Sequence, residues 1–250
     1  MAESAPIFAV HGWALNAAVF EPLGEDLAGR PLLAVDLPGH GMRRNELLGS
    51  DPAPLVARLL EQAPGRSIWL GWSLGGMLAL GAALQAPERI EALVIVCAAA
   101  SFICRPHWPR GMPREQLRRM AADLALAPRE VVSNFLALQV LASPGARTAL
   151  RGLHEALKKR GEASAQALGD GLRLLEIMDY STVLGQLEVP VLVITGDRDR
   201  LVTPESAQAL GDGLPHGRCV HFRQAAHVPF LTHRALFETT IAAELERWRV

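Results

Sequence analysis

The sequence predicts an α/β protein with a mostly parallel central sheet, helices on both faces of the sheet and a helical insertion. Short apolar runs alternate with segments of helical spacing, which is the pattern of a parallel sheet connected through helices. These runs are almost continuously apolar, as expected for strands buried on both faces. With 250 residues, 50% of them hydrophobic and 20% charged, the chain is long and apolar enough to form one folded domain.

The first half of the chain supplies four of the expected strands. Each is a short apolar run that stops at glycine, proline or another turn-forming residue, and the segments between them repeat apolar residues at helical spacing. The expected strands cover 7–10, 32–36, 67–72 and 92–97, and the expected helices cover 17–28, 54–62 and 73–85.

The stretch 100–187 interrupts this alternation because it contains helical patterns only, separated by prolines. We therefore expect a helical cap at 100–187, inserted into a core formed by 1–99 and 188–250. The cap holds 12 Lys and Arg against 8 Asp and Glu, a net charge of +4, while the core carries −5. Strands at 189–195 and 219–222, followed by helices at 204–210 and 231–248, are expected to complete the core.

Composition excludes several classes of function. The net charge of −1 lacks the basic excess of a nucleic-acid-binding protein. The three cysteines show no CxxC spacing, so we expect free thiols in a reducing cytoplasm rather than a zinc or disulfide-exchange site. We also expect no signal peptide and no membrane association, because no basic leader and no apolar run of about 18 residues is present.

A candidate nucleophile lies between the third expected strand and the helix that follows it. Gly71-Trp72-Ser73-Leu74-Gly75 matches G-x-S-x-G in the strand-to-helix context of a nucleophile elbow. Glycine suits the flanking positions because a Cβ would clash in so sharp a turn. The sequence therefore assigns Ser73 as the nucleophile, at a helix N-terminus that favours developing negative charge.

A serine nucleophile needs a general base, and eight histidines compete for that role. His227 directly follows the last expected strand, which places it at the same edge of the sheet as Ser73. His216 precedes that strand, His221 lies within it, and His233 falls in the expected final helix. We therefore assign His227 as the base.

The acid that orients the base is expected after the strand at 189–195. Asp197 and Asp199 both follow this strand, and we favour Asp199 because it lies farther out in the loop that can reach the histidine. The segment 97–101 contains no carboxylate, which excludes an acid after the preceding strand. Asp36 is interpreted as structural.

Two backbone amides are expected to stabilise the oxyanion of a tetrahedral intermediate. One belongs to Leu74, directly after the nucleophile, and the other to Trp13, in the loop after the first strand. His11, two residues before Trp13, is interpreted as a residue that orders this loop rather than as an acid or base.

With these residues placed, the chain resembles the α/β-hydrolase superfamily over nearly its whole length. Within it, the chain is similar to the esterases that demethylate a pimeloyl chain on acyl carrier protein during biotin synthesis. The matching segments are His11-Gly12-Trp13 with Leu15-Asn16-Ala17, Val35-Asp36-Leu37-Pro38-Gly39, the stretch from Ile68 to Gly76, Pro87-Glu88-Arg89, Phe135-Leu136-Ala137-Leu138-Gln139 and the stretch from Ala225 to Phe230.

The resemblance implies roles for further residues. It implies the triad Ser73, Asp199 and His227, and it selects Asp199 over Asp197. The residues that it places along the acyl site, besides Ser73, are Trp13, Leu74, Phe135, Leu136, Ala137, Leu138 and Gln139. It also implies that Arg147 and Arg151 bind the acidic carrier protein. Two further arginines of the family fall at Glu130 and Asn134 here, next to Arg129.

The expected function is that of a cytoplasmic, monomeric serine carboxylesterase that forms an acyl-enzyme and uses no metal or organic cofactor. Its expected partners are acyl carrier protein and a small ester, with no nucleic acid and no membrane. A general short-acyl carboxylesterase, a carbon–carbon bond hydrolase and a non-catalytic binding relative stay as alternatives. The sequence leaves open the acyl length, the dependence on a carrier, the oligomeric state and the role of the cysteines.

Overall fold

A seven-stranded sheet forms the centre of the protein, which the computed structural model describes from residue 5 to residue 249. The strand order is β2-β3-β1-β4-β5-β6-β7, and only β2 runs antiparallel to its neighbour. The expectation of a mostly parallel sheet is therefore confirmed. The strands are β1 (Ile7–Val10), β2 (Asp26–Leu27), β3 (Arg30–Val35), β4 (Ser67–Trp72), β5 (Ile90–Val96), β6 (Val191–Gly196) and β7 (Gly217–Phe222).

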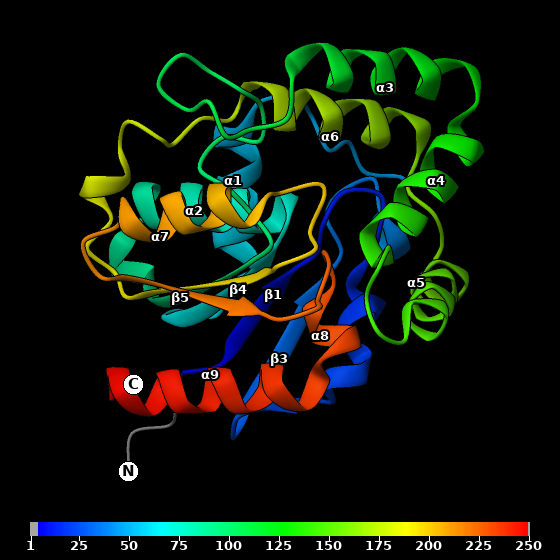
Figure 1. The fold of residues 1–250 in the computed structure, drawn as a ribbon. Helices are drawn as coiled ribbons and strands as arrows, with labels where there is room; N and C mark the ends of the chain where they lie inside the picture. The colour runs from blue at the N-terminus through cyan, green and yellow to red at the C-terminus, as the bar shows by residue number, and fades with distance from the viewer. Residues whose placement is uncertain (1–4, 250) are drawn as a thin grey trace.

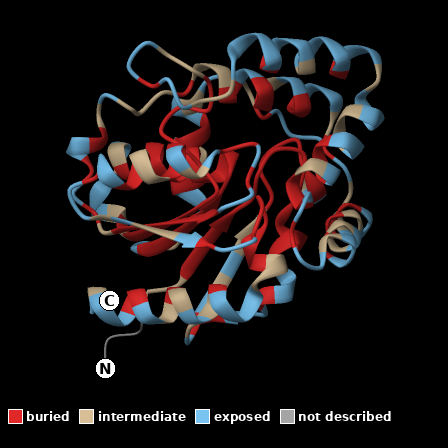
Figure 2. Ribbon diagram, in the orientation of Figure 1, coloured by how far each residue is buried: buried red, intermediate tan, exposed pale blue. Residues whose placement is uncertain are grey.

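Helices cover both faces of this sheet. Figure 1 shows α1, α2 and α7 on one face and α9 on the other. The central strands β1, β4 and β5 and the helix α2 are almost fully buried, as the red interior of Figure 2 shows, so the core lies between these layers. The helices outside residues 100–187 are α1 (Pro52–Gln62), α2 (Leu74–Gln85), α7 (Pro204–Asp212), α8 (Pro229–Thr232) and α9 (Arg234–Trp248), with 3₁₀ turns η1 (Ala17–Leu23), η2 (Gly41–Arg43) and η3 (Pro87–Arg89). A further 3₁₀ turn, η4 (Leu184–Gln186), comes shortly before β6.

Four helices occupy the stretch between β5 and β6 and lie over the end of the sheet (Figure 1). They are α3 (Arg114–Leu126), α4 (Pro128–Val140), α5 (Ala146–Arg160) and α6 (Ala165–Ile177). The division between core and cap at residues 100 and 187 stays a prediction. Within residues 5–249, no helix has the length and the apolar sequence that crossing a bilayer would require.

One expected helix, at 17–28, is wrong in its second half. The chain forms the 3₁₀ turn η1 only as far as Leu23, and β2 then pairs with β3 in a tight hairpin. Gly24 and Gly29 adopt φ angles of 84° and 76°, which end the turn and close the hairpin. The apolar spacing fits a helix as far as Leu27, but the positive φ angles of Gly24 and Gly29 do not.

An ion pair between the buried Asp36 and the partly exposed Arg160 joins the end of β3 to helix α5. Arg160 Nη2 lies 2.9 Å from Asp36 Oδ2, and the Asp36 carboxylate also accepts hydrogen bonds from the backbone amides of Ala17 and Met42, each at 2.8 Å. Burial alone would raise the pKa of Asp36, but the hydrogen bonds from Arg160 and from the two amides hold it below its ordinary value. Asp36 therefore links the end of β3 to helix α5 through its ion pair with Arg160.

Candidate active site

Ser73 occupies the strained turn that the sequence motif predicts. It connects β4 to α2 with φ 55° and ψ −117°, a conformation that non-glycine residues seldom adopt. Its backbone amide donates to the carbonyl oxygen of Val96 at 2.9 Å, which fixes the turn against the neighbouring strand β5. The side chain therefore projects from a rigid position at the carboxyl end of the sheet.

The flanking glycines are required by close backbone contacts. A Cβ on Gly75 would lie 2.1 Å from the carbonyl oxygen of Val10, and a Cβ on Gly71 would lie 2.5 Å from that of Gly75. Both separations are far shorter than real carbon–oxygen contacts. The motif spacing thus reflects how tightly α2 is pressed against β1 and β4.

Asp199 and His227, which the sequence predicts as acid and base, are hydrogen-bonded to each other. His227 Nδ1 lies 2.7 Å from Asp199 Oδ2, and both side chains are buried. The other carboxylate oxygen of Asp199 accepts from the backbone amides of Leu201 and Val202 at 2.8 and 3.1 Å. This arrangement holds the proton on Nδ1 and leaves Nε2 as the basic nitrogen. Within residues 5–249, Nε2 has no hydrogen-bond partner.

The residue before Ser73 ties His227 to the nucleophile elbow. The indole nitrogen of Trp72 donates to the carbonyl oxygen of His227 at 2.8 Å, and the two rings lie 5.8 Å apart. No hydrogen bond joins the Ser73 hydroxyl to His227 in the described chain. Such bonds commonly tighten only when substrate binds.

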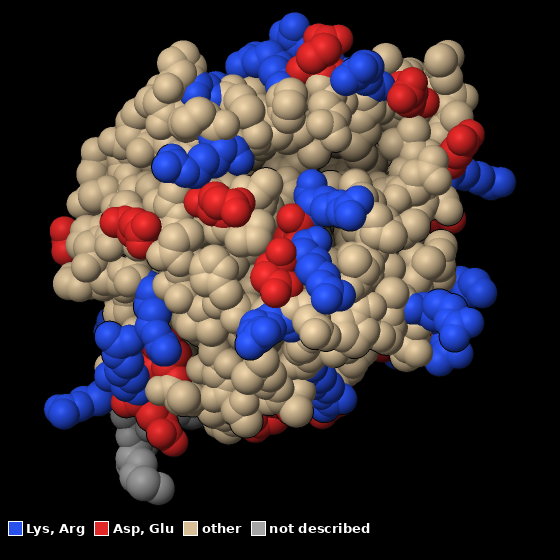
Figure 3. Space-filling model, viewed as in Figure 1, with Lys and Arg blue, Asp and Glu red and all other residues tan. Residues whose placement is uncertain are grey.

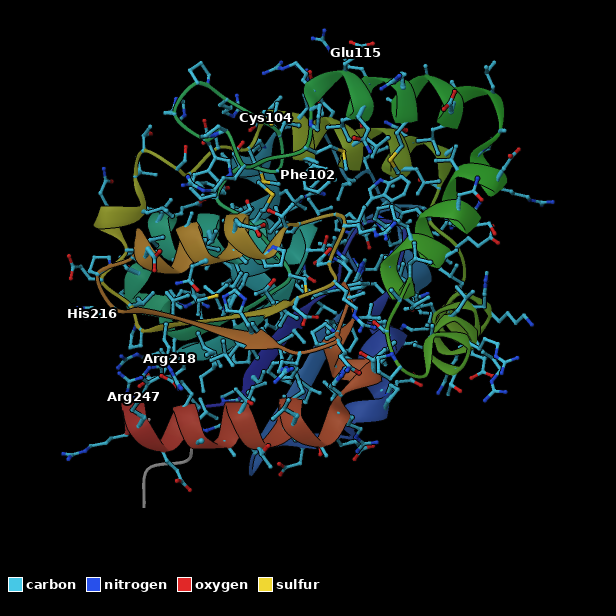
Figure 4. All side chains as sticks on the ribbon, viewed as in Figure 1. Phe102, Cys104, Glu115, His216, Arg218 and Arg247 are labelled. Carbon is cyan, nitrogen blue, oxygen red and sulfur yellow. The ribbon has the colours of Figure 1, made fainter. Side chains whose placement is uncertain are left out.

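The competing residues lie elsewhere. Asp197 is exposed, whereas Asp199, two residues on, is buried. His221 pairs with the Gln208 side chain at 2.7 Å. His216 lies at the opposite end of the sheet, near Arg218 and Arg247 (Figure 4). His233, expected inside the final helix, instead lies at the break between α8 and α9.

The two expected oxyanion donors are both free. Leu74 is the first residue of α2, and its amide and that of Trp13 donate no hydrogen bond within residues 5–249. The side chain of Trp13 is fixed from two directions. Its indole nitrogen donates to the Leu168 carbonyl oxygen of α6 at 2.8 Å, and its ring meets the edge of Phe135 at 4.8 Å. The cap thereby orients the loop that carries one donor.

His11 orders the loop before Trp13. Its Nδ1 donates to the Gly12 carbonyl oxygen at 2.8 Å, and its Nε2 accepts from the Leu37 amide at 2.9 Å. Burial and the neighbouring His40 lower the pKa of His11 to about 3, so the imidazole is neutral and can accept this bond. Burial likewise lowers the pKa of His40 to about 4.

The residues of the segment 135–139, which is expected to line the acyl site, differ in how far they are buried. Phe135 and Leu136 are buried, Leu138 is half-buried and Ala137 is exposed, so Ala137 points away from the interior. Gln139 is fully buried, and neither its amide nitrogen nor its amide oxygen has a partner within residues 5–249. Its backbone oxygen accepts from the His227 amide at 3.0 Å. A buried amide beside the base, with both polar atoms unpaired, suits contact with a polar substrate group.

Helix α4 separates two cavities. Val132 and Leu136 line a cavity of about 310 Å³ that reaches Leu168, whose carbonyl oxygen holds Trp13. Val131 and Phe135 line a second cavity of about 450 Å³ that reaches Leu201, whose amide holds Asp199. Neighbouring residues of one helix therefore face different cavities on either side of the site.

Cys97 is a neighbour of the acid–base pair that the sequence analysis did not identify. It follows β5 with φ 48°, is fully buried, and its Sγ lies 3.8 Å from the carbonyl oxygen of Ala226. Burial, followed by the nearby Asp199 carboxylate, raises the pKa of this thiol well above its ordinary value. The spacing of residues around Cys97 does not indicate these contacts, because Asp199 and Ala226 lie more than a hundred residues after Cys97 in the chain.

The outer face of α5 is basic. Arg147 and Arg151 are both exposed, and Arg151 pairs loosely with Glu155 at 3.7 Å. Lys158 and Lys159 add positive charge on the same helix, and Figure 3 shows Lys and Arg side chains over the region of α5. Glu130 and Asn134 of α4 are also exposed.

Comparison with known proteins places the chain in a family. A family model described as the alpha/beta hydrolase fold matches residues 5–234. A pimeloyl–acyl-carrier-protein methyl ester esterase of Xanthomonas campestris pv. campestris (strain B100) is 41% identical over 225 residues, which cover 90% of this chain and 88% of the relative. The protein of the same name from Klebsiella pneumoniae subsp. pneumoniae is 38% identical over 229 residues, covering 91% and 88%.

Solved structures agree at the level of the fold. An esterase from Exiguobacterium antarcticum superposes with a TM-score of 0.87 at 22% sequence identity, covering 98% of this chain and 93% of the other. The glycine-flanked serine turn, the buried Asp–His pair and these matches lead to one conclusion: the chain belongs to the alpha/beta hydrolase family and, within it, to the group formed by the pimeloyl–acyl-carrier-protein methyl ester esterases.

Proposed function

We propose that this protein is a serine carboxylesterase that hydrolyses the methyl ester of a pimeloyl chain carried on acyl carrier protein. The observation that carries the proposal is the buried hydrogen bond of 2.7 Å between His227 and Asp199, next to the strained turn at Ser73. Identity of 41% with relatives of that name supports the choice of substrate.

Acylation begins when the Ser73 hydroxyl attacks the ester carbonyl carbon and His227 Nε2 takes the hydroxyl proton. Asp199 accepts a hydrogen bond from Nδ1–H and stabilises the imidazolium that forms. The backbone amides of Trp13 and Leu74 donate to the oxyanion, and losing one such donor costs about 2.7–4 kcal/mol of transition-state stabilisation. The intermediate then collapses, the carbon–oxygen bond to the methoxy group breaks, and His227 gives its proton to the departing methanol.

Deacylation repeats these steps with water in place of serine. His227 Nε2 removes a proton from water as the water oxygen attacks the acyl carbon, and the same proton then returns to Ser73 Oγ. The products are the free pimeloyl carboxylate, still linked to its carrier at the other end, and methanol. The full cycle consumes one water molecule and regenerates the enzyme.

The acyl chain is proposed to lie between the core and the cap. Trp13, Phe135 and Leu136 supply apolar surface near Ser73, and the unpaired amide of Gln139 supplies polar contacts. The exposed residues Arg147 and Arg151 are proposed to bind the acidic carrier protein, because complementary charge steers such encounters. Ala137 is left out of the proposed acyl site, since its side chain is exposed.

The decisive assay follows methanol release and loss of the methyl ester from purified carrier-bound substrate. Wild-type protein is expected to demethylate it, and Ser73→Ala is expected to be inactive while keeping the wild-type circular dichroism spectrum. Labelling by a fluorophosphonate provides a second readout, which Ser73→Ala should also abolish. A wild-type protein that neither labels nor hydrolyses any ester would be a non-catalytic relative, and the proposal would be wrong.

Growth of a biotin-requiring bacterial strain that lacks its own demethylating esterase separates this function from general esterase activity. The wild-type gene is expected to restore growth without biotin, and Ser73→Ala is not. Soluble protein that hydrolyses short free esters but fails to restore growth would instead identify a general carboxylesterase.

A further inference from the structure

The buried thiol of Cys97 completes a group of three different metal-binding side chains. Within residues 5–249, the Cys97 Sγ, an Asp199 carboxylate oxygen and a His227 ring nitrogen all lie within 4.8 Å of one another. All three residues are buried. Sulfur, oxygen and nitrogen donors from Cys, Asp and His are the ligands that zinc prefers in proteins.

We propose that this group is an inhibitory site for Zn²⁺ or a similar soft divalent cation, held by Cys97, Asp199 and His227. The tetrahedral bond lengths of zinc separate neighbouring ligand atoms by roughly 3.4–3.6 Å. The three ligand atoms lie within 4.8 Å of one another, and Nδ1 and Oδ2 are only 2.7 Å apart, so binding requires this pair to separate and Cys97 Sγ to approach. Nδ1 is the nitrogen that the geometry favours, because it lies 2.7 Å from Asp199 Oδ2.

Charge balance makes the occupied site suitable for a buried position. Binding releases the thiol proton of Cys97 to water and moves the ring proton of His227 from Nδ1 to Nε2, so that Nδ1 is free to bind the ion. A thiolate, a carboxylate and a neutral imidazole around Zn²⁺ then carry no net charge, which limits the cost of burying the ion.

Occupation of this site would stop catalysis. With the cation on Nδ1, the hydrogen bond that orients His227 toward its acid is lost, and the metal-bound imidazole no longer accepts the proton of Ser73. The inhibition is expected to develop slowly, because all three ligands are shielded from solvent. The site goes beyond the proposed esterase function, since it assigns a role to Cys97, which the reaction does not use.

The first test measures Zn²⁺ inhibition of hydrolysis of a small free ester, with reversal by a chelator. Cys97→Ala and Cys97→Ser are expected to weaken inhibition by about 100-fold or more, since even partners outside the metal ligands change affinity by about 10- to 100-fold. Cys219→Ala is the matched control, because this half-buried thiol lies beside His221 at 3.7 Å, away from the acid–base pair. Equal inhibition of the wild type and the Cys97 variants would contradict the proposal.

The second test does not depend on activity, so it separates failure of this site from failure of the proposed function. Co²⁺ is added to the variant Cys104→Ala/Cys219→Ala, in which Cys97 is the only thiol. A thiolate-to-cobalt charge-transfer band in the near ultraviolet is expected, and Zn²⁺ should displace it. Absence of the band in this folded variant would overturn the inference, even if the enzyme hydrolyses its ester normally.

Discussion

The core and the cap differ in charge, in packing and in what each contributes to the site. The core carries a net charge of −5 and supplies Ser73, Asp199 and His227 from the carboxyl ends of buried parallel strands. The cap carries +4, consists of helices, and contributes Phe135 and Gln139 together with an exposed basic face. The candidate catalytic residues therefore lie on a buried sheet, whereas the residues proposed for recognition lie on helices between β5 and β6.

The largest expected effect tests whether the core alone supplies the chemistry. Asp199→Asn should lower kcat by about 10⁴ on free and carrier-bound esters alike, because the amide no longer holds Nδ1–H of His227. Steady-state assays with both substrates measure this. Asp197→Asn, two residues away and exposed, is the matched control and should be near wild type. A comparable loss in Asp197→Asn would show that the wrong carboxylate has been assigned.

The next effect tests the link between the two regions. Asp36→Asn should lower the free energy of unfolding by about 1–3 kcal/mol, since it leaves the partly exposed Arg160 without its carboxylate. Chemical denaturation at pH 7 measures this loss. Glu21→Gln removes the exposed pair with Lys159, which also joins core to cap, and should cost under about 1 kcal/mol.

The stability at low pH provides a second test of the ion pair between Asp36 and Arg160. The pKa of Asp36 is lowered on folding, so its contribution is complete above the ordinary carboxyl pKa and disappears as the pH falls through the folded value. The difference in stability between Asp36→Asn and the wild type should therefore shrink in acid. A difference that grows in acid would contradict the ion-pair explanation.

A third prediction concerns the loops at the carboxyl edge of the core. The pKa of His40 falls from 6.5 to about 4 on folding, mainly through burial, so between these values the unfolded chain holds a proton that the folded protein lacks. Stability should therefore fall as the pH drops from 6.5 to 4, by up to about 1.4 kcal/mol per pH unit. His40→Asn keeps a donor for the Pro38 carbonyl oxygen and should remove the His40 part of this dependence, leaving the part due to the buried His11. An unchanged slope would show that His40 titrates normally.

The smallest expected effect belongs to the cap. Arg147→Glu/Arg151→Glu should raise KM for the carrier-bound ester by about tenfold at low salt and leave a small free ester unchanged. The matched control is Arg234→Glu on α9, which breaks a similar exposed pair with Glu238 on the core. Equal losses on both substrates would place the effect in folding or in the acyl site instead.

The site was predictable where it depends on local sequence. The G-x-S-x-G turn and the positions of Asp199 and His227 after β6 and β7 follow from strand ends and turn residues. The parallel sheet was predictable for the same reason, because its strands are continuous apolar runs. The helix expected at 17–28 failed because apolar periodicity was not weighed against Gly24 and Gly29.

Contacts between distant segments were not predictable from one sequence. Nothing near Asp36 indicates that Arg160 is its partner, and nothing near Cys97 indicates Asp199 or His227. The family resemblance suggested the segment 135–139 as a unit, but helical geometry turns Ala137 outward while Gln139 points inward. Which side chains of α4 are buried depends on how the whole helix packs against its neighbours, which local sequence does not specify.

Because α4 lies between two cavities, substitutions on this helix can change either cavity separately. A substitution at Val132 alters the volume on the Trp13 side, whereas one at the adjacent Val131 alters the volume on the Asp199 side. A substitution on one side of α4 can thus change the size of one cavity and leave the other unchanged, so the two cavities can vary independently.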